Sequence, residues 1–479
     1  GGLFAADRKD FPMFDSSVYL ERRRALAAAL PGALILIPGN DDVPMDFASN
    51  VYPFRQDSSF RYFFGLNRPG LIGLIDVEKD EHWLFGDDPG IDATIWLGEV
   101  PPLAAEAEAV GIAHVAPLRV LATRLASASG GGQPLLYPPP YRAETVQTMA
   151  AFMGQSPGWV RENSSSSLVD GIVSLREIKS ADEIAEMEAA LTVTAAMHHA
   201  AMAATRPGVV EQAVIGAAEA IALQAGMRFA YQPIFSGRGE VLHNLRYDRV
   251  LSAGELVVND SGALSASGYA SDITRTLPVS GRFDPMQRRL YDAVLRAQEE
   301  AIAGCRPGTR FLDLHLAAAH VLAEELCDIG LFRGDPADVV ASGAYALVLP
   351  CGLGHQIGLD VHDMEALGED RVGYDTETRR STLFGLRSLR LGKVLKAGMT
   401  VTVEPGLYFI PQLIDMWKAE GRHAALIDYD RFDAFRRFGG IRIEDDVLVT
   451  PGASRILGPA IARTAEEVEA RMATAAIVL

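Results

Sequence analysis

In the first third of the chain, one segment has apolar and polar residues arranged with a helical period. Short apolar runs follow this segment. Residues 18–30 have a helical pattern that Ser16 or Ser17 can cap and that stops at Pro31. The apolar runs that follow are bounded by turn residues and predict strands. They are residues 33–38, 61–66, 70–77 and 82–85. A helix followed by strands predicts an α/β region in this part of the chain.

Longer helical patterns dominate the chain after its run of serines at residues 164–167. We place a domain boundary near residue 175, which gives domains 1–175 and 176–479. Ser180 and Glu183 form a capping-box pattern at the start of the first long helix. The predicted helices are residues 183–204, residues 211–226, a segment that begins at Asp284-Pro285, and residues 311–329. Strand-like segments lie between them, so the whole chain is predicted to be of the mixed α/β (α+β) class.

Two aspartates lie in the segment from Leu256 to Pro278, where β-formers flank a turn rich in glycine and serine. The pattern predicts a hairpin with Asp260 on one strand and Asp272 on the other. Facing side chains on neighbouring strands can touch, so two carboxylates on one face would need a positive group between them. Taken alone, the segment would favour two turn or surface aspartates.

Three later stretches each interrupt an apolar run with a side chain that can bind a metal. They carry His355 and His362, then Glu404, and then Glu444. Charged groups in such surroundings are costly to bury without partners. The candidate ligands are Asp260, Asp272, His355, Glu404 and Glu444. Four carboxylates and one imidazole suit two divalent ions, and such an oxygen-rich set favours manganese, cobalt or iron over a thiolate zinc site.

Composition and charge argue against several other functions. The chain has 479 residues, of which 48% are hydrophobic, and this is enough for a large core and two or more domains. A net charge of -18 argues against nucleic acid as a partner. We expect no membrane association, because no apolar run reaches the ~18 residues that span a bilayer and the N-terminal sequence lacks a secretion signal. Three cysteines are too few for a disulfide framework, which favours a cytoplasmic protein.

Five motifs, in their order and wording, resemble the proline-specific pita-bread metallopeptidases, prolidase and aminopeptidase P. The motifs are DSG at 260–262, SDITRT at 271–276, GHQIGLDVHD at 354–363, TVEPG at 402–406 and GGIRIEDD at 439–446. The similarity extends upstream to residues 52–70 and 93–99, which resemble the creatinase-type N-terminal domain of the same enzymes. The resemblance therefore implies a C-terminal pita-bread domain, of the creatinase/aminopeptidase fold, behind a creatinase-type N-terminal α/β domain.

The same resemblance implies two divalent metal ions, with manganese as the first expectation and cobalt, zinc and iron as alternatives. It makes Asp260 a ligand of one ion, and His355 with Glu404 ligands of the other. Asp272 and Glu444 are the implied bridging ligands. Glu404 is also the implied proton acceptor in hydrolysis.

Further matches concern the substrate. His243 and His362 match the catalytic histidines that contact substrate, and Arg390 matches the arginine with which prolidase grips the free carboxylate of a dipeptide. Arg442 is implied to orient the ligand carboxylates. Cys351 is a departure, because the family usually has a histidine at this place and a thiol cannot carry an imidazolium charge.

The leading hypothesis is a two-metal exopeptidase that cleaves the bond between an N-terminal residue and proline in dipeptides or short peptides. Arg390 favours a dipeptidase, and an aminopeptidase that acts on tripeptides and longer peptides is the alternative. A non-catalytic pita-bread binding module and a metal-free enzyme of the creatinase type are disfavoured, because all five ligand positions are filled. Cys351 would account for a reduced activity or an altered substrate. We expect a homodimer whose substrates are short proline-containing peptides.

Overall fold

The computed structural model describes residues 14–98 and 100–475. The chain divides into two compact units, and it passes from the first unit to the second between Glu177 and Ile178. Residues 364–371 return to the first unit, and the described residues after 371 belong to the second. The domain boundary that we placed near residue 175 lies close to the passage from Glu177 to Ile178. No helix in the described part of the chain is both long enough and apolar enough to cross a membrane.

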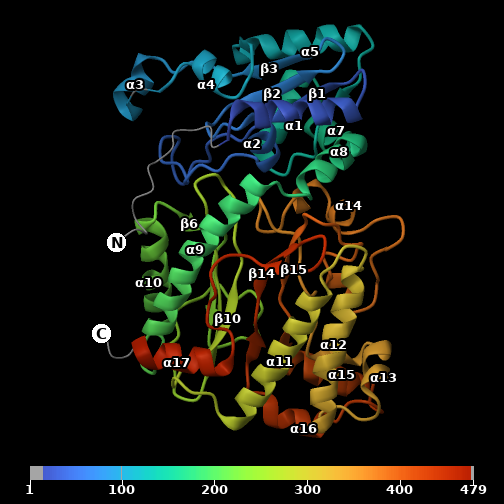
Figure 1. The fold of residues 1–479 in the computed structure, drawn as a ribbon. Helices are drawn as coiled ribbons and strands as arrows, with labels where there is room; N and C mark the ends of the chain where they lie inside the picture. Colours follow the sequence, from blue (N-terminus) through green and yellow to red (C-terminus); the bar gives the residue numbers. More distant parts are fainter. Residues whose placement is uncertain (1–13, 99, 476–479) are drawn as a thin grey trace. The chain divides into compact units, whose positions relative to one another are not determined.

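The first unit is built on a mixed five-stranded sheet with the order β4-β3-β2-β1-β5 (Figure 1). The strands are β1 (Leu34–Pro38), β2 (Ile72–Asp76), β3 (Glu81–Phe85), β4 (His114–Ala116) and β5 (Leu135–Leu136). The helices are α1 (Ser16–Ala29), α2 (Ser58–Phe64), α3 (Ile91–Leu97), α4 (Leu103–Ala109), α5 (Leu121–Gly130), α6 (Ala143–Met153), α7 (Pro157–Glu162) and α8 (Ser166–Arg176). Apolar side chains of β1 and β2 form a core with those of α5 and α6.

Two local predictions for this unit are wrong, although the other three predicted strands are confirmed as β1, β2 and β3. Residues 61–66 were expected to form a strand but lie mostly in α2, which begins at an Asp57 N-cap and ends at Gly65, where φ is 67°. Six of the seven residues of α2 are buried, so no polar face reveals its helical period. The cap of α1 is Asp15, whose carboxylate accepts the backbone N–H of Ser17 at 2.9 Å.

The second unit carries its strands between two groups of helices (Figure 1). Helix α9 packs against α10, and α11 packs against α12. The helices are α9 (Ala181–Ala204), α10 (Glu211–Gln224), α11 (Pro285–Gly304), α12 (Phe311–Asp328), α13 (Pro336–Ser342), α15 (Pro411–Glu420), α16 (Tyr429–Phe432) and α17 (Ala465–Ala475). The short helix α14 (Glu369–Gly373) spans the division between the units.

The strands of the second unit form two small sheets and two pairs, with the orders β10-β8-β7, β11-β14-β15, β12-β13 and β6-β9. The strands are β6 (Arg228–Phe229), β7 (Ile234–Ser236), β8 (Leu256–Asp260), β9 (Ala263–Leu264), β10 (Thr274–Pro278), β11 (Thr400–Val403), β12 (Gly406–Tyr408), β13 (Gly440–Arg442), β14 (Asp445–Val449) and β15 (Ser454–Ile456). All β8 and β10 residues are buried, as expected for strands covered on both faces.

Strand register brings distant carboxylates together. Thr274 of β10 lies opposite Asp260 of β8, and a single β-bridge joins Thr274 to Glu444. In the second sheet, Val403 of β11 lies opposite Asp445 of β14. Because Glu404 follows Val403 and Glu444 precedes Asp445, these two glutamates lie at neighbouring strand ends.

The predicted helices of this unit are confirmed, whereas the predicted hairpin is only partly correct. Helix α9 begins with the capping box of Ser180 and Glu183, and α11 begins at Pro285 after an Asp284 N-cap. Strands β8 and β10 do pair in antiparallel fashion, but Asp272 lies in the segment before β10 and not on it. The connection is not a simple turn, because it contains β9, which pairs with β6.

Candidate metal and peptide site

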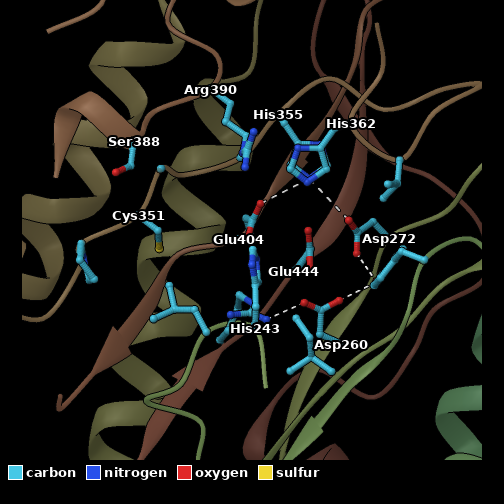
Figure 2. Close-up of a pocket in the computed structure, with 18 of the residues that line it drawn as sticks. His243, Asp260, Asp272, Cys351, His355, His362, Ser388, Arg390, Glu404 and Glu444 are labelled. Atoms are coloured by element: carbon cyan, nitrogen blue, oxygen red, sulfur yellow. Dashed lines mark hydrogen bonds and ion pairs between the residues drawn. The ribbon is translucent and has the colours of Figure 1, made fainter. Parts of the chain in front are cut away.

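All ten residues singled out in the sequence line one pocket of the second unit, which has a volume of about 620 Å³ (Figure 2). They are His243, Asp260, Asp272, Cys351, His355, His362, Arg390, Glu404, Arg442 and Glu444. In Figure 2, Cys351 and Ser388 lie on the side of the pocket away from Asp272. The fold thus gathers carboxylates, imidazoles and one thiol around a single cavity.

Asp260 and Asp272 share a tyrosine that the sequence did not point to. The hydroxyl oxygen of Tyr231 lies 2.5 Å from Oδ1 of Asp260 and also contacts Oδ1 of Asp272. A phenol has one proton, so it can donate to only one carboxylate at a time. The phenol is neutral, so a positive group is needed to offset the remaining repulsion between the two aspartates.

His355 faces Asp272 and Glu404. Its Nε2 lies 3.5 Å from Oδ2 of Asp272 and 3.6 Å from Oε1 of Glu404. Its Nδ1 lies 2.9 Å from the carbonyl oxygen of Gln356, a contact that fits Nδ1–H as the donor and directs Nε2 into the pocket. Thr402 supports both ligands, because its hydroxyl accepts the His355 backbone N–H at 3.1 Å and lies 3.3 Å from Glu404.

Glu444 and Asp260 are held by side chains from neighbouring strands. The hydroxyl of Thr274 donates to Oε2 of Glu444 at 2.6 Å. The guanidinium of Arg442 lies 2.5 Å from Oδ2 of Asp260 and 3.0 Å from the hydroxyl of Tyr408. Arg442 is 4% exposed, so its positive charge acts on Asp260 with little screening by water.

A second buried arginine lies beside Glu444 and the start of strand β14. The Arg275 side chain is 1% exposed, and its guanidinium pairs with Asp445 at 2.7 Å. It also donates to the carbonyl oxygens of Glu444 at 2.7 Å and Thr274 at 2.9 Å. Arg275 therefore ties β10 to the start of β14.

Burial and mutual repulsion shift the pKa values of the pocket carboxyls. Burial, followed by the charge of Asp260, raises the pKa of Asp272 to about 7. Burial, followed by the charge of Asp272, raises the pKa of Glu444 well above its ordinary value. Burial alone would lower the pKa of His355, but its bond to Asp272 and the charge of Glu404 raise it to about 9. When these carboxyls are ionised, they therefore need a cation between their oxygen atoms.

The residues present fit a divalent metal. Asp272, His355 and Glu444 each offer one ligand atom, and these atoms all lie within 4.8 Å of one another. A divalent ion would supply the positive charge that the buried carboxylates need. Asp260 and Glu404 contribute further oxygen donors to the same pocket. Carboxylate-rich donor sets of this kind suit hard or intermediate divalent cations.

The pKa shift of Glu444 predicts how metal-free protein responds to pH. We expect the stability of the metal-free Glu444→Gln variant to rise relative to that of metal-free wild type as the pH increases from about 5 to 8. The raised pKa means that protonated Glu444 favours folding at low pH, and this contribution is lost as the pH rises through the folded-state pKa.

Urea unfolding of both EDTA-treated proteins at several pH values measures this difference. Glutamine has no charge to lose and keeps an oxygen for the Thr274 hydroxyl, so it is the matched substitution. Added Mn²⁺ should reverse the order at high pH, because ionised Glu444 then has a cation partner. A stability difference that does not change with pH would contradict the expectation.

The pocket also carries groups suited to a peptide. The rings of His355 and His362 are stacked, with centroids 3.8 Å apart and an interplanar angle of 13°. His243 and Arg390 line the pocket as well. Burial, and then the charge of Glu404, raises the pKa of Cys351 to about 12. Cys351 is therefore a neutral thiol at the place where an imidazole was expected.

Several supporting residues were missed in the sequence, among them the four below and the Thr274 and Tyr408 hydroxyls described above. Tyr231, Thr402 and Arg275 contact ligands or their strands as described above. His198, inside α9, is fully buried, with Nε2 3.0 Å from the carbonyl oxygen of Ser261, the residue after Asp260. Arg275 and Thr402 lie inside the quoted motifs, so their position was a usable signal. Tertiary contacts bring Tyr231 to the pocket and His198 to the segment after Asp260, and the local sequence gives no pattern for either.

Comparisons with protein families match both halves of the chain. The family described as metallopeptidase family M24 matches residues 185–451. The family described as aminopeptidase P, N-terminal domain, matches residues 19–137. Both matches agree with the motifs that lie in the two parts of the sequence.

Curated relatives and solved structures cover almost the whole chain. Xaa-Pro dipeptidase from Homo sapiens is 31% identical over 461 residues, which cover 95% of this chain and 91% of the relative. Xaa-Pro aminopeptidase from Escherichia coli is 29% identical over 469 residues, which cover 95% of this chain and 98% of the relative. The structure of zinc-substituted Escherichia coli aminopeptidase P in complex with product has a TM-score of 0.79 and 28% identity, and it covers 96% of this chain and 99% of that chain.

Proposed function

Because the chain belongs to metallopeptidase family M24 and is a proline-specific metallo-exopeptidase with the pita-bread fold, we propose that it hydrolyses Xaa-Pro dipeptides at a two-metal site. One observation carries the proposal: five metal-capable side chains, two further histidines and Arg390 converge on one pocket. An Xaa-Pro aminopeptidase acting on tripeptides and longer peptides is the second candidate. It is favoured by the similarity to Escherichia coli aminopeptidase P, which covers 96% of the chain.

In this proposal the ligands divide between two ions. Asp260 would hold one ion, and His355 with Glu404 would hold the other. Asp272 and Glu444 would bridge them. The pKa values of both carboxyls are raised, which fits buried carboxylates that need a cation when they are ionised. The oxygen-rich donor set favours manganese, with cobalt, zinc and iron as alternatives. When bound, the ions would supply Lewis-acid activation of the scissile carbonyl and of water.

The remaining steps fall to the chain's own side chains. Glu404 would accept a proton from the attacking water and pass it to the proline nitrogen, and burial raises its pKa towards the range that suits this exchange. His243 and His362 would contact the peptide and stabilise the negative charge that develops on the carbonyl oxygen. Arg442, paired with Asp260 at 2.5 Å, would keep that ligand oriented.

The experiment that tests the function compares Ala-Pro with Ala-Pro-Ala. Hydrolysis of both peptides is measured with EDTA-treated protein, before and after addition of Mn²⁺. Metal-dependent cleavage of the dipeptide alone would support a dipeptidase, and cleavage of the tripeptide would support the aminopeptidase. Absence of cleavage of both peptides by metal-loaded protein would contradict both proposals.

Arg390 is the residue on which the preference for dipeptides depends. We expect Arg390→Ala to lower kcat/KM for Ala-Pro by about 10- to 100-fold, because the lost charge-assisted hydrogen bonds to a carboxylate are worth ~1.5–3 kcal/mol. Ala-Pro-Ala should be less affected, since its free carboxylate lies one residue further along. Arg379 is the matched control, because it is exposed and does not line the pocket. Equal losses on the two peptides would remove the case for a dipeptidase.

Cys351 tests whether the departure from the family pattern limits activity. We expect Cys351→His to raise turnover of Ala-Pro by about tenfold, because an imidazole can donate a stronger hydrogen bond than a thiol and can carry a charge. Cys351→Ser is the control, since it keeps the small size without an imidazole. An unchanged or lower rate in Cys351→His would indicate that the cysteine belongs to a different substrate pocket.

We also propose that the protein is a homodimer. The support is an apolar surface on helix α3, where Ile91, Ile95 and Trp96 are 74%, 68% and 84% exposed. Exposed apolar side chains gathered on one short helix are typical of an interaction surface. Sedimentation equilibrium measures the mass of the assembly directly, and a monomer at micromolar concentration would contradict the proposal.

A further inference from the structure

A lysine and an aspartate form a buried ion pair outside the pocket. Nζ of Lys179 lies 2.8 Å from Oδ2 of Asp363, and each side chain is 1% exposed. Neither residue lines the pocket. Buried ion pairs are a poor source of stability, because desolvation offsets their attraction, and their best-attested use is to fix one arrangement of the chain. The neighbours of Lys179 and Asp363 show which segments of the chain this pair holds together.

Asp363 lies at the end of the loop that carries two histidines of the pocket, His355 and His362. It directly follows His362, and its backbone N–H donates to the carbonyl oxygen of Gln356 at 2.9 Å. Its Oδ1 accepts the backbone N–H of Asp360 at 3.3 Å. A Cβ at Gly358 would lie 2.6 Å from Oδ2 of Asp363 and 2.8 Å from Cε of Lys179. Glycine at that position therefore leaves the space in which the two charged groups meet.

Lys179 is itself fixed by rigid structure. It precedes Ser180, the N-cap of the 24-residue helix α9. Its backbone N–H donates to the carbonyl oxygen of Gly398 at 2.8 Å, just before strand β11, which leads to Glu404. The lysine thus joins the start of α9 to the segment before β11, the strand that leads to Glu404, and to the loop that bears His362.

We propose that Lys179 is a positioning residue that, through Asp363, holds His362 in its stacked place against His355. The stacked geometry, with ring centroids 3.8 Å apart, requires the end of the loop to be fixed relative to its beginning. The loop is also tied to the segment before Asp272, because Ala270 donates its N–H to the carbonyl oxygen of Gly358 at 2.8 Å. The effect on turnover rests on the function proposed for His362, whereas the effect on ring position does not.

The test separates positioning from stability with a single and a double variant. Lys179→Met leaves Asp363 buried without its ammonium partner, and Lys179→Met/Asp363→Asn removes both charges while keeping an acceptor for Asp360. We expect kcat for Ala-Pro to fall about 10- to 100-fold in both variants, because small displacements of a group that contacts substrate cost this much. Metal content should stay at the wild-type level in both. The double variant should regain most of the stability that the single variant loses.

A second readout does not depend on catalysis. In metal-free protein with ¹⁵N-labelled histidine, the ring signals of His362 should move in both variants, because stacked rings shift each other's resonances. Lys418→Met is the matched control, since Lys418 pairs with Asp430 at 2.9 Å on the surface, with side chains 41% and 91% exposed.

Wild-type kcat in the double variant, or unmoved His362 signals, would overturn the positioning role. Moved His362 signals in a protein whose wild type does not cleave Ala-Pro would instead support the positioning role and contradict the proposed function. If Lys179→Met does not fold, the double variant alone tests the positioning role. The double variant is expected to fold, because it contains no unpaired buried charge.

Discussion

Replacement of Asp272 by asparagine is expected to abolish both hydrolysis of Ala-Pro and retention of metal. Asp272 is buried and faces His355, and it offers a ligand atom within 4.8 Å of those of His355 and Glu444. Loss of its charge removes the proposed bridge between the two ions, and Lewis-acid activation worth several kcal/mol is lost with it. We therefore expect kcat/KM to fall by about 10³-fold or more, which corresponds to ~4 kcal/mol.

Metal analysis of the purified variant, together with its kcat/KM, measures both effects. Glu444→Gln should behave in the same way, since it removes the other proposed bridge. Asp430→Asn is the control for the substitution itself, because the Asp430 side chain is 91% exposed and does not line the pocket. Retention of both metal and activity in Asp272→Asn would show that the bridging assignment is wrong.

Loss of Arg275 is expected to cause the largest fall in stability. Arg275→Met removes a 1% exposed guanidinium that pairs with Asp445 and donates to the backbone of two strands. Removal of one partner from a buried ion pair costs about 3–5 kcal/mol, because the other charge loses its main partner. Asp445 would keep the more distant guanidinium of Arg463, at 3.8 Å. We expect the free energy of unfolding, measured with urea, to fall by that amount.

The double variant Arg275→Met/Asp445→Leu shows whether the unpaired charge is the cause. Without the carboxylate, no buried charge lacks a partner, so at least half of the lost stability should return. The carbonyl oxygen of Glu444 would still lose its guanidinium donor, and that of Thr274 would keep only the Glu444 N–H, so recovery should be incomplete. A double variant as unstable as the single one would assign the loss to these backbone contacts instead.

Local signals explain the elements that the sequence predicted well. Helix α11 was placed correctly because Asp284 and Pro285 are both strong signals for a helix start. The predicted fold class, family and enzyme class are confirmed by the family matches, the curated relatives and the similar structures. The order of the five motifs made the family and the enzyme class predictable, because these motifs contain the metal-capable side chains that interrupt apolar runs. The roles assigned to individual site residues stay predictions.

Tertiary structure explains the elements that the sequence did not predict. Helix α2 is buried on nearly all sides, so it has no amphipathic pattern to recognise. Asp272 was placed on a hairpin strand, but β9 within the connection pairs with β6 and draws the chain away from a simple turn. Tyr231 reaches the aspartates from a different part of the chain, 29 residues from Asp260. Such contacts depend on the folded whole, and no local period encodes them.

The distance along the chain between the candidate ligands has a consequence for biosynthesis. Asp260 is paired with Arg442, 182 residues later, and Glu444 follows that arginine. While the ribosome is still synthesising the chain, the segment that holds Glu444 emerges long after the one that holds Asp260. The complete set of candidate ligands can therefore assemble only after residue 444 has emerged from the ribosome, so we expect tight metal binding only after that point. Stalled nascent chains that end before residue 440 should bind no Mn²⁺ tightly, and tight binding by them would contradict this order of events.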